Sequence, residues 1–362
     1  MTRSYLLPIV AIVFMVLARP AAAADNPATE AYELRMKGKV DQARTLLEET
    51  LAKMPDNAAA YYELARTQMH MALGNPKNLE RNFADAQKSI DQAIVHDSQK
   101  VVYHTFAGHV AYFRAYYAIM KGEPNVRENF IKACSAFETA LKLRPDYPQV
   151  MLYLVELHGK FPENAGAEKS KAMAYAGQLE TTNEVYAAKA KSILSPESCG
   201  VEFWKALLSA KKPVNADVLE ELGKAHLRED QVEQAVKSFE QAVEHNPGKT
   251  YLFLDLSIYH TWRAMRARKN DEELFQKSLN AGDAAVTRYL NSKPIHPMEA
   301  YALGVQSKYK SAAGDTEQAQ ELIKRAKSLD PYFSKATGAP DPDQFIPPTK
   351  ISQNHRYLMR PF

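Results

Sequence analysis

The sequence predicts an all-α protein, an α-solenoid built from helix–turn–helix repeats and followed by an extended tail. Apolar residues recur at spacings of three and four along most of the chain, which is the pattern of amphipathic helices. The 362 residues include only 14 glycines, and glycine costs about 1 kcal/mol per helix position relative to alanine. One pattern of two helices closed by a proline returns several times, which is typical of repeat architectures.

The first 24 residues have the features of a signal peptide. Arg3 forms a basic start, residues 6–17 an apolar core, and residues 22–24 a small-residue cleavage site before Asp25. The apolar run is shorter than the roughly 20 residues that span a bilayer. We therefore expect an exported protein, in a bacterial periplasm or secreted, with no stable membrane span after cleavage. An uncleaved anchor is the alternative.

Charge and cysteine content narrow the classes of function. The formal net charge is +3, and loss of Arg3 and Arg19 with the signal peptide leaves 3 − 2 = +1. Nucleic-acid binding needs a concentrated basic surface, so we expect no nucleic-acid partner. Cys134 and Cys199 are expected on helices several steps apart, too far for a disulfide, and two lone cysteines match no spaced metal motif.

The repeat is clearest between Val218 and Pro247. Its first helix places Leu219, Leu222, Gly223 and His226 on one face, and its second helix places Ala235, Phe239 and Ala242 on one face. This stretch resembles the tetratricopeptide repeat, a helix–turn–helix unit, with His226 where the family has an aromatic residue. The resemblance implies a right-handed superhelix. Small residues at 223 and 242 would let the helix axes approach closely, with Phe239 filling the remaining volume.

The same register assigns residues 25–333 to a solenoid of about eight such repeats. The fifth repeat, residues 183–213, is placed by elimination and by an apolar stripe that includes Trp204. The units at 58–98, 101–145 and 250–294 are longer than the standard repeat, and we expect their first helices to be about two turns longer. A single pair cannot bury its apolar faces alone, so the pairs should stack into one elongated array.

Residues 334–362 form a different, Pro-rich segment with almost no helical periodicity. We expect an extended tail packed over the last helix. The alternative is that Phe345–Ile346 or Tyr357–Leu358 docks in a groove, on the same chain or on another copy.

The chain carries no recognisable catalytic motif: HExxH, GxSxG, the P-loop and GxGxxG are all missing from the sequence. His104 and His109 are five residues apart, whereas a metal-binding pair on one helix needs a spacing of three or four. We expect no enzyme, no cofactor and no metal.

The resemblance implies that first helices line a concave binding face. We matched the ligand-contacting positions of the family to this sequence and added a Trp/Arg-rich rim in the seventh repeat. The resulting candidate partner-binding residues are Tyr62, Arg66, Met69, His109, Tyr112, Phe113, Lys224, Arg228, Trp262, Arg263 and Arg266. The lysine/asparagine clamp of chaperone-binding members is missing from these slots. The alternatives are that the aromatics of residues 103–117 are core and that the basic rim is a solvated helix face.

We interpret the protein as an exported scaffold or adaptor that binds a protein or peptide through this concave face. One alternative is a periplasmic accessory subunit of a transport system that holds a small molecule between the lengthened helices. Another is a structural role through self-association.

Overall fold

The protein is an all-α solenoid of successive helix–turn–helix units. The computed structural model describes residues 26–333 except 75–77 and 211–212, so the predicted signal peptide and tail lie outside the described residues. Sixteen α-helices and three short 3-10 segments fill the described ranges, which contain no strand. None of the helices in these ranges is both long and apolar enough to cross a membrane.

The helices follow one another as antiparallel pairs. The first three pairs are α2 (Pro27–Met36) with α3 (Val40–Lys53), α4 (Ala58–Gly74) with α5 (Leu79–His96), and α6 (Val101–Lys121) with α7 (Val126–Leu143). The next two are α8 (Pro148–Lys160) with α9 (Lys169–Thr182) and α12 (Ala216–Arg228) with α13 (Val232–His245). Between them, α10 (Glu184–Leu194) packs against α8 and α9, and α11 (Val201–Ala210) packs against α12. The last two are α14 (Tyr251–Ala267) with α15 (Glu272–Asn291) and α16 (His296–Ala312) with α17 (Thr316–Leu329).

The chain divides into two compact units. The first unit runs from Ile90 to Pro247, and the second combines the chain before Ile90 with the chain from Gly248 onward. The boundaries fall inside α5 and within the 3-10 segment η4 (Pro247–Lys249), not in long linkers. The assignment of residues 25–333 to a single array therefore stays a prediction.

Side-chain caps mark the starts of several helices. The Asn215 side chain accepts hydrogen bonds from the backbone N–H groups of Asp217 and Val218 at the start of α12. Asp271 and Asp315 cap α15 and α17 in the same way. Such caps satisfy backbone donors that have no partner within the helix. The starts of these helices are therefore encoded locally.

The close crossing of paired helices depends on glycine opposite phenylalanine. A Cβ added at Gly223 on α12 would lie 2.3 Å from a ring carbon of Phe239 on α13, and Phe239 is fully buried. Gly108 on α6 and Phe137 on α7 repeat the arrangement at 2.5 Å. The expected role of residue 223 is confirmed, because no larger side chain fits between these helices without movement of the ring.

The lengthened repeats share their extra residues between both helices. Helix α6 has 21 residues and α7 has 18, against 13 in α12 and 14 in α13. Helices α14 and α15 have 17 and 20 residues. The two-turn extension expected of first helices holds for α6, but α4, with 17 residues, and α14 gain only about one turn over α12. When both helices of a pair lengthen together, each covers the apolar face of the other along its whole length. This explains why the extra residues are divided between the two helices.

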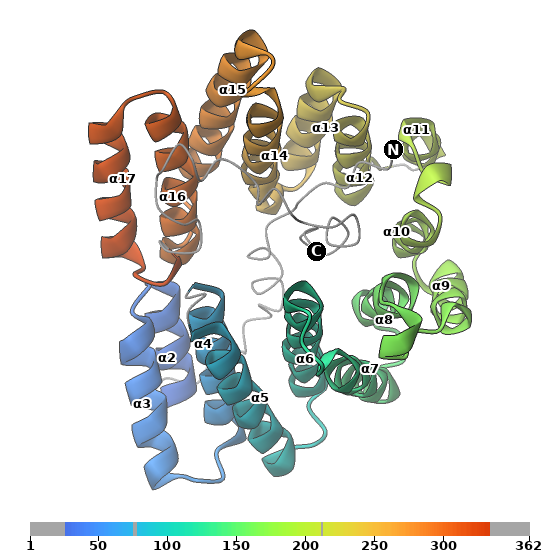
Figure 1. Ribbon diagram of the computed structural model, residues 1–362. Coiled ribbons are helices and arrows are strands. Elements are labelled where there is room, and N and C mark those ends of the chain that lie inside the picture. The colour runs from blue at the N-terminus through green and yellow to red at the C-terminus, as the bar shows by residue number, and fades with distance from the viewer. Residues whose placement is uncertain (1–25, 75–77, 211–212, 334–362) are drawn as a thin grey trace. The chain divides into compact units, whose positions relative to one another are not determined.

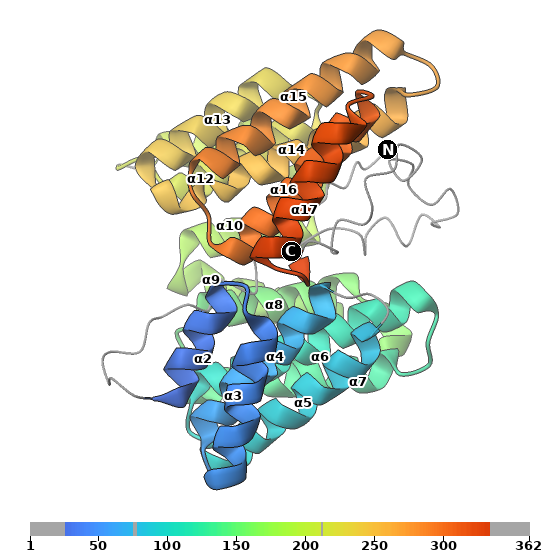
Figure 2. The same ribbon diagram turned by 90° about the vertical axis from the view of Figure 1, so that its left-hand side faces the viewer.

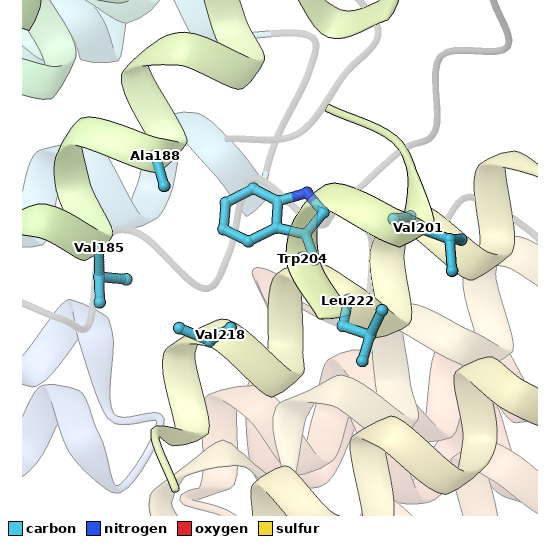
Figure 3. Close-up of a cluster of buried hydrophobic side chains, with 7 residues drawn as sticks. Val185, Ala188, Val201, Trp204, Val218 and Leu222 are labelled. Carbon is cyan, nitrogen blue, oxygen red and sulfur yellow. The ribbon is translucent and has the colours of Figure 1, made fainter. Parts of the chain in front are cut away.

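A buried tryptophan in the first unit connects α11 of the degenerate fifth repeat with α10 and α12. Trp204 on α11 is fully buried among Val185 and Ala188 of α10 and Val218 and Leu222 of α12 (Figure 3). A side chain of this size fills the space that the usual repeat residues fill elsewhere. Trp204, a member of the apolar stripe that located this repeat in the sequence, therefore faces the core.

We expect Gly223→Ala to destabilise the protein, because the new methyl group must displace the Phe239 ring. Overpacking costs about 1–3 kcal/mol, against about 1 kcal/mol gained from helix propensity. Gly177→Ala in α9 is the matched control, since a Cβ there meets nothing within 4 Å. Thermal unfolding followed by circular dichroism should show a lower Tm for Gly223→Ala and an equal or higher Tm for Gly177→Ala. A Tm for Gly223→Ala at or above that of the wild type would contradict the packing argument.

Candidate partner-binding surfaces

The candidate residues lie on first helices of the repeats. In the first unit, α6, α8 and α12 occupy one side, with α7, α9 and α13 on the other (Figure 1). In the second unit, α14 and α16 likewise lie on one side, with α15 and α17 on the other. The predicted residues fall on α4, α6, α12 and α14, so each can be placed by its own surroundings.

A buried carboxylate joins two arginines in the second unit. Glu63 on α4 accepts from Arg35 Nε of α2 at 2.7 Å with one oxygen and from Arg66 Nη1 at 2.9 Å with the other. The side chains of Arg35 and Glu63 are 0% and 4% exposed. Burial lowers the pKa of Arg35, while the Glu63 carboxylate acts in the opposite direction. Charge-assisted bonds of this kind are among the strongest in proteins.

Two tyrosine rings flank this ion pair. The Arg66 guanidinium lies over the rings of Tyr62 and Tyr32, at 5.4 and 5.3 Å from the ring centroids, and Arg35 lies 5.6 Å from Tyr32. The structure therefore brings the predicted residues Tyr62 and Arg66 together, and both tyrosines remain half-buried. Met69, predicted for the same surface, is only 1% exposed and belongs to the core of the unit.

The Trp/Arg-rich rim lies on α14 of the second unit. Trp262 and Arg263 are half-buried, and Arg266 is exposed one turn after Trp262. On a helix, residues four positions apart lie on the same face. Trp262 and Arg266 therefore form one small surface that joins a large ring to an accessible cation.

The aromatic residues predicted on α6 lie in the interior of the first unit. The His109 ring meets the rings of Phe137 and Tyr153 at 5.4 and 4.7 Å, and Tyr112 lies between Tyr153 and Phe161. Burial lowers the pKa of His109 to about 4, so it is neutral near pH 7. Tyr112 and Phe113 are 2% and 4% exposed. These side chains pack as core, which was the alternative reading of the cluster.

The two predicted cations of α12 are engaged within the first unit. Lys224 Nζ donates to Glu220 at 2.5 Å and to Glu221 at 3.0 Å. Arg228 Nη2 donates to the Cys199 carbonyl oxygen at 3.1 Å. Both side chains are half-buried, so a partner would have to compete with these bonds for either charge.

Sequence reasoning missed the residues that organise the polar chemistry of the second unit. Arg35 and Glu63 stand at positions that the repeat pattern leaves variable, and only their placement on adjacent first helices shows that they pair. Lys308 on α16 was also missed, although it occupies the slot that Met69 holds in the second repeat. Burial lowers the pKa of Lys308 to about 8.

A cysteine–histidine contact in the first unit does not have the protonation state of a catalytic pair. The backbone N–H of Glu168 donates to His158 Nδ1 at 3.2 Å, so Nε2 carries the ring proton and faces Cys134 Sγ at 3.7 Å. Burial raises the pKa of Cys134 to about 12, which keeps it a thiol rather than a nucleophilic thiolate. Cys199 is also buried and free, and it precedes α11 rather than lying in a helix as expected.

Metal-ligating side chains do not gather in the described part of the chain. No group of three or more histidine, cysteine, aspartate or glutamate residues is arranged there to hold an ion.

We expect Glu63→Gln to lower the free energy of unfolding, because it removes the carboxylate charge that pairs directly with two buried arginines. Breaking a buried ion pair by removal of one partner costs about 3–5 kcal/mol. Urea denaturation followed by circular dichroism measures the change. The control is Glu128→Gln, which breaks an exposed pair with Lys132 on α7 and should leave the transition nearly unchanged. Equal midpoints for the two variants would show that the buried pair does not stabilise the fold.

Comparison with known proteins identifies the repeat. Tetratricopeptide repeat family profiles match residues 34–75 and residues 216–249. The first range contains the whole of α3 and α4, and the second contains the whole pair of α12 and α13. A search of curated proteins found no match to the sequence.

Solved structures with similar chains share little sequence identity with this one. A tetratricopeptide repeat protein from Parabacteroides merdae is 14% identical with a TM-score of 0.36, over 86% of this chain and 97% of its own. PilW, a type IV pilus biogenesis factor, is 16% identical with a TM-score of 0.31, over 76% and 96%. Human IFIT1, solved as a dimer with PPP-AAAA, is 15% identical with a TM-score of 0.36, over 83% and 81%. Similarity at this level carries no functional argument. Two stretches of this chain therefore match the tetratricopeptide repeat, and they lie within a longer succession of helices.

Proposed function

We propose that the protein is an exported scaffold or adaptor that binds a protein or peptide partner through the first helices of its repeats. Tetratricopeptide repeats generally mediate protein–protein interaction, and they are typically non-catalytic scaffolds. The observation that carries the proposal is the pairing of half-buried Trp262 with exposed Arg266 on α14. Tryptophan and arginine are the side chains most enriched among residues that dominate binding energy.

The charge around Trp262 indicates the chemistry of the partner. Between Trp262 and Lys269 the chain carries four cations and no anion, namely Arg263, Arg266, Arg268 and Lys269. An acidic segment would be attracted to this end of α14, and rim charges of this kind raise association rates in a salt-dependent way. A preformed helix also loses little conformational entropy on binding. An acidic peptide or loop is therefore the partner that this surface fits.

We expect the double substitution Trp262→Ala/Arg266→Ala to abolish capture of the partner while leaving the fold intact. The wild-type protein and the variant are used as bait against an extract of the envelope fraction, and bound proteins are identified by mass spectrometry. Lys277→Ala, on an exposed position of the second helix α15, is the matched control and should retain the partner. Recovery of the same proteins by wild type and double variant would show that the rim is not the binding surface.

Export is the second part of the proposal, and it rests on the first 24 residues of the sequence. Expression of the full chain in a Gram-negative host should give a mature protein whose N-terminal residue is Asp25, recovered in the osmotic-shock fraction. Substitution in the apolar core by Val10→Arg stops insertion of the signal and should retain an uncut chain in the cytoplasm. An uncut wild-type chain held in the membrane fraction would favour an anchor instead.

A further inference from the structure

The two ends of the repeat series meet within the second unit. The segment that follows α17 lies against α4, and the views in Figures 1 and 2 both place the end of α17 beside α2 and α4. Four residues form the centre of this contact, which we call the terminal latch: His70 on α4 and Asp330, Tyr332 and Phe333 after α17. His70 and Asp330 are 260 residues apart in the sequence.

The polar centre of the terminal latch is a buried histidine–aspartate bond. His70 Nε2 lies 2.8 Å from Asp330 Oδ2, and the two side chains are 1% and 0% exposed. The other oxygen of Asp330 accepts from the backbone N–H groups of Tyr332 and Phe333, at 2.8 and 2.9 Å. Because the carboxylate accepts on both oxygens, Nε2 of the neutral imidazole carries the proton and donates it. Nδ1 is buried and has no hydrogen-bond partner among residues 26–333 as far as the structure describes them.

Rings and backbone close the contact around this bond. Phe333 is fully buried, with its ring 4.3 Å from that of His70, and Tyr332 donates its hydroxyl to Asp41 of α3 at 2.8 Å. The backbone of Tyr332 passes so close to Gly74 that an added Cβ would lie 2.6 Å from its carbonyl carbon. At Gly38 an added Cβ would lie 1.8 Å from the Leu329 oxygen. The two chain segments are therefore fitted to each other and not merely adjacent.

Asp330 also balances the buried charge of the first repeats. Arg35 and Arg66 carry two positive charges, and Glu63 supplies one negative charge. Asp330 adds the second negative charge. The charge of Arg35 contributes to lowering the pKa of His70. With a neutral His70 the buried groups sum to zero, whereas a protonated His70 leaves an uncompensated positive charge. Uncompensated buried charges are strongly unfavourable.

We propose that the terminal latch is a pH-sensitive device, closed while His70 is neutral and loosened when mild acid protonates it. The charged and titratable groups around His70 are Arg35 from α2, Glu63 from α4, and Asp330 and Tyr332 from the end of the chain. A protonated ring would place the new Nδ1–H in a buried position without an acceptor. The cost of that unpaired donor falls on the closed state alone, because water satisfies it in the open state.

The direction of the effect follows from proton linkage. Burial is the largest influence on His70 and lowers its pKa below the usual 6.5, although Asp330 opposes the shift. The open state therefore binds protons at a pH where the closed state does not. The closed state is fully favoured above the unperturbed pKa and loses stability as the pH falls below it, by up to about tenfold in the opening equilibrium per pH unit.

Hydrogen exchange measured by mass spectrometry tests the latch directly. Backbone amides at 332 and 333, which donate to Asp330, should exchange through an opening that becomes more frequent between about pH 7.5 and about pH 5, after correction for intrinsic rates. His70→Gln keeps a donor near the Nε2 position but cannot be protonated, so its opening should not change with pH. His296→Gln is the control, because His296 is an exposed histidine whose Nδ1 lies 3.2 Å from the Lys37 carbonyl oxygen. This variant should keep the wild-type pH dependence of opening.

Gly74→Ala tests the contact independently of the histidine. Alanine favours the helix, so α4 should persist, yet its methyl group would push Tyr332 away and remove protection from 332 and 333 at neutral pH. Peptides from α13 in the first unit should exchange as in the wild type. Equal pH dependence in wild type and His70→Gln overturns the proposal. Wild-type protection of amides 332 and 333 in Gly74→Ala also overturns the proposal. Loss of that protection in His70→Gln at neutral pH, to the level of Gly74→Ala, overturns it as well.

Discussion

A pair of amphipathic helices has more apolar surface than it can bury within itself, and the architecture of this chain follows from that constraint. Within a pair, glycine opposite phenylalanine lets the axes come close, as at Gly223 with Phe239 and Gly108 with Phe137. Between pairs, the remaining apolar face is covered by the next pair, as Trp204 shows between α10 and α12. Stacking is thus required for burial, and a continuous side of first helices is its by-product.

The need to bury apolar faces also separates the polar residues of the interior from those that remain on the surface. The charges of Glu63, Arg35 and Arg66 lie inside the second unit, where each bond is strong because water does not compete. The cations at the end of α14 include the exposed Arg266, which is accessible to a partner. A side chain's position in the repeat pattern does not distinguish these cases, since Arg66 and Trp262 both occupy slots that face a ligand in related repeats. Their surroundings decide which of them can form new bonds.

Much of the fold was predictable from the sequence because repeats are encoded locally. Glycine, phenylalanine and proline return in the same order at Gly108, Phe137 and Pro145 as at Gly223, Phe239 and Pro247. The caps at Asn215 and Asp271 lie next to the helices they start. The candidate site was predictable only in part. Tyr62 and Arg66 do lie together, but Met69, His109, Tyr112 and Phe113 pack inside. Burial of a given slot depends on the length and side chains of neighbouring helices, as α6 and α8 show, and no local pattern encodes it. The bond from His70 to Asp330 joins residues 260 apart and has no signature in the repeat.

The composition of the two units sets an order for folding along the nascent chain. The first unit is a continuous stretch from Ile90 to Pro247, so it can assemble as soon as that stretch is released from the ribosome or the translocation channel. The second unit needs the last helices as well as the first ones. The early helices must therefore wait for almost the entire polypeptide, and closing a loop of this size carries an entropic cost. A chaperone that holds α2 to α4 during that delay would act on the segment whose arginines still lack Asp330.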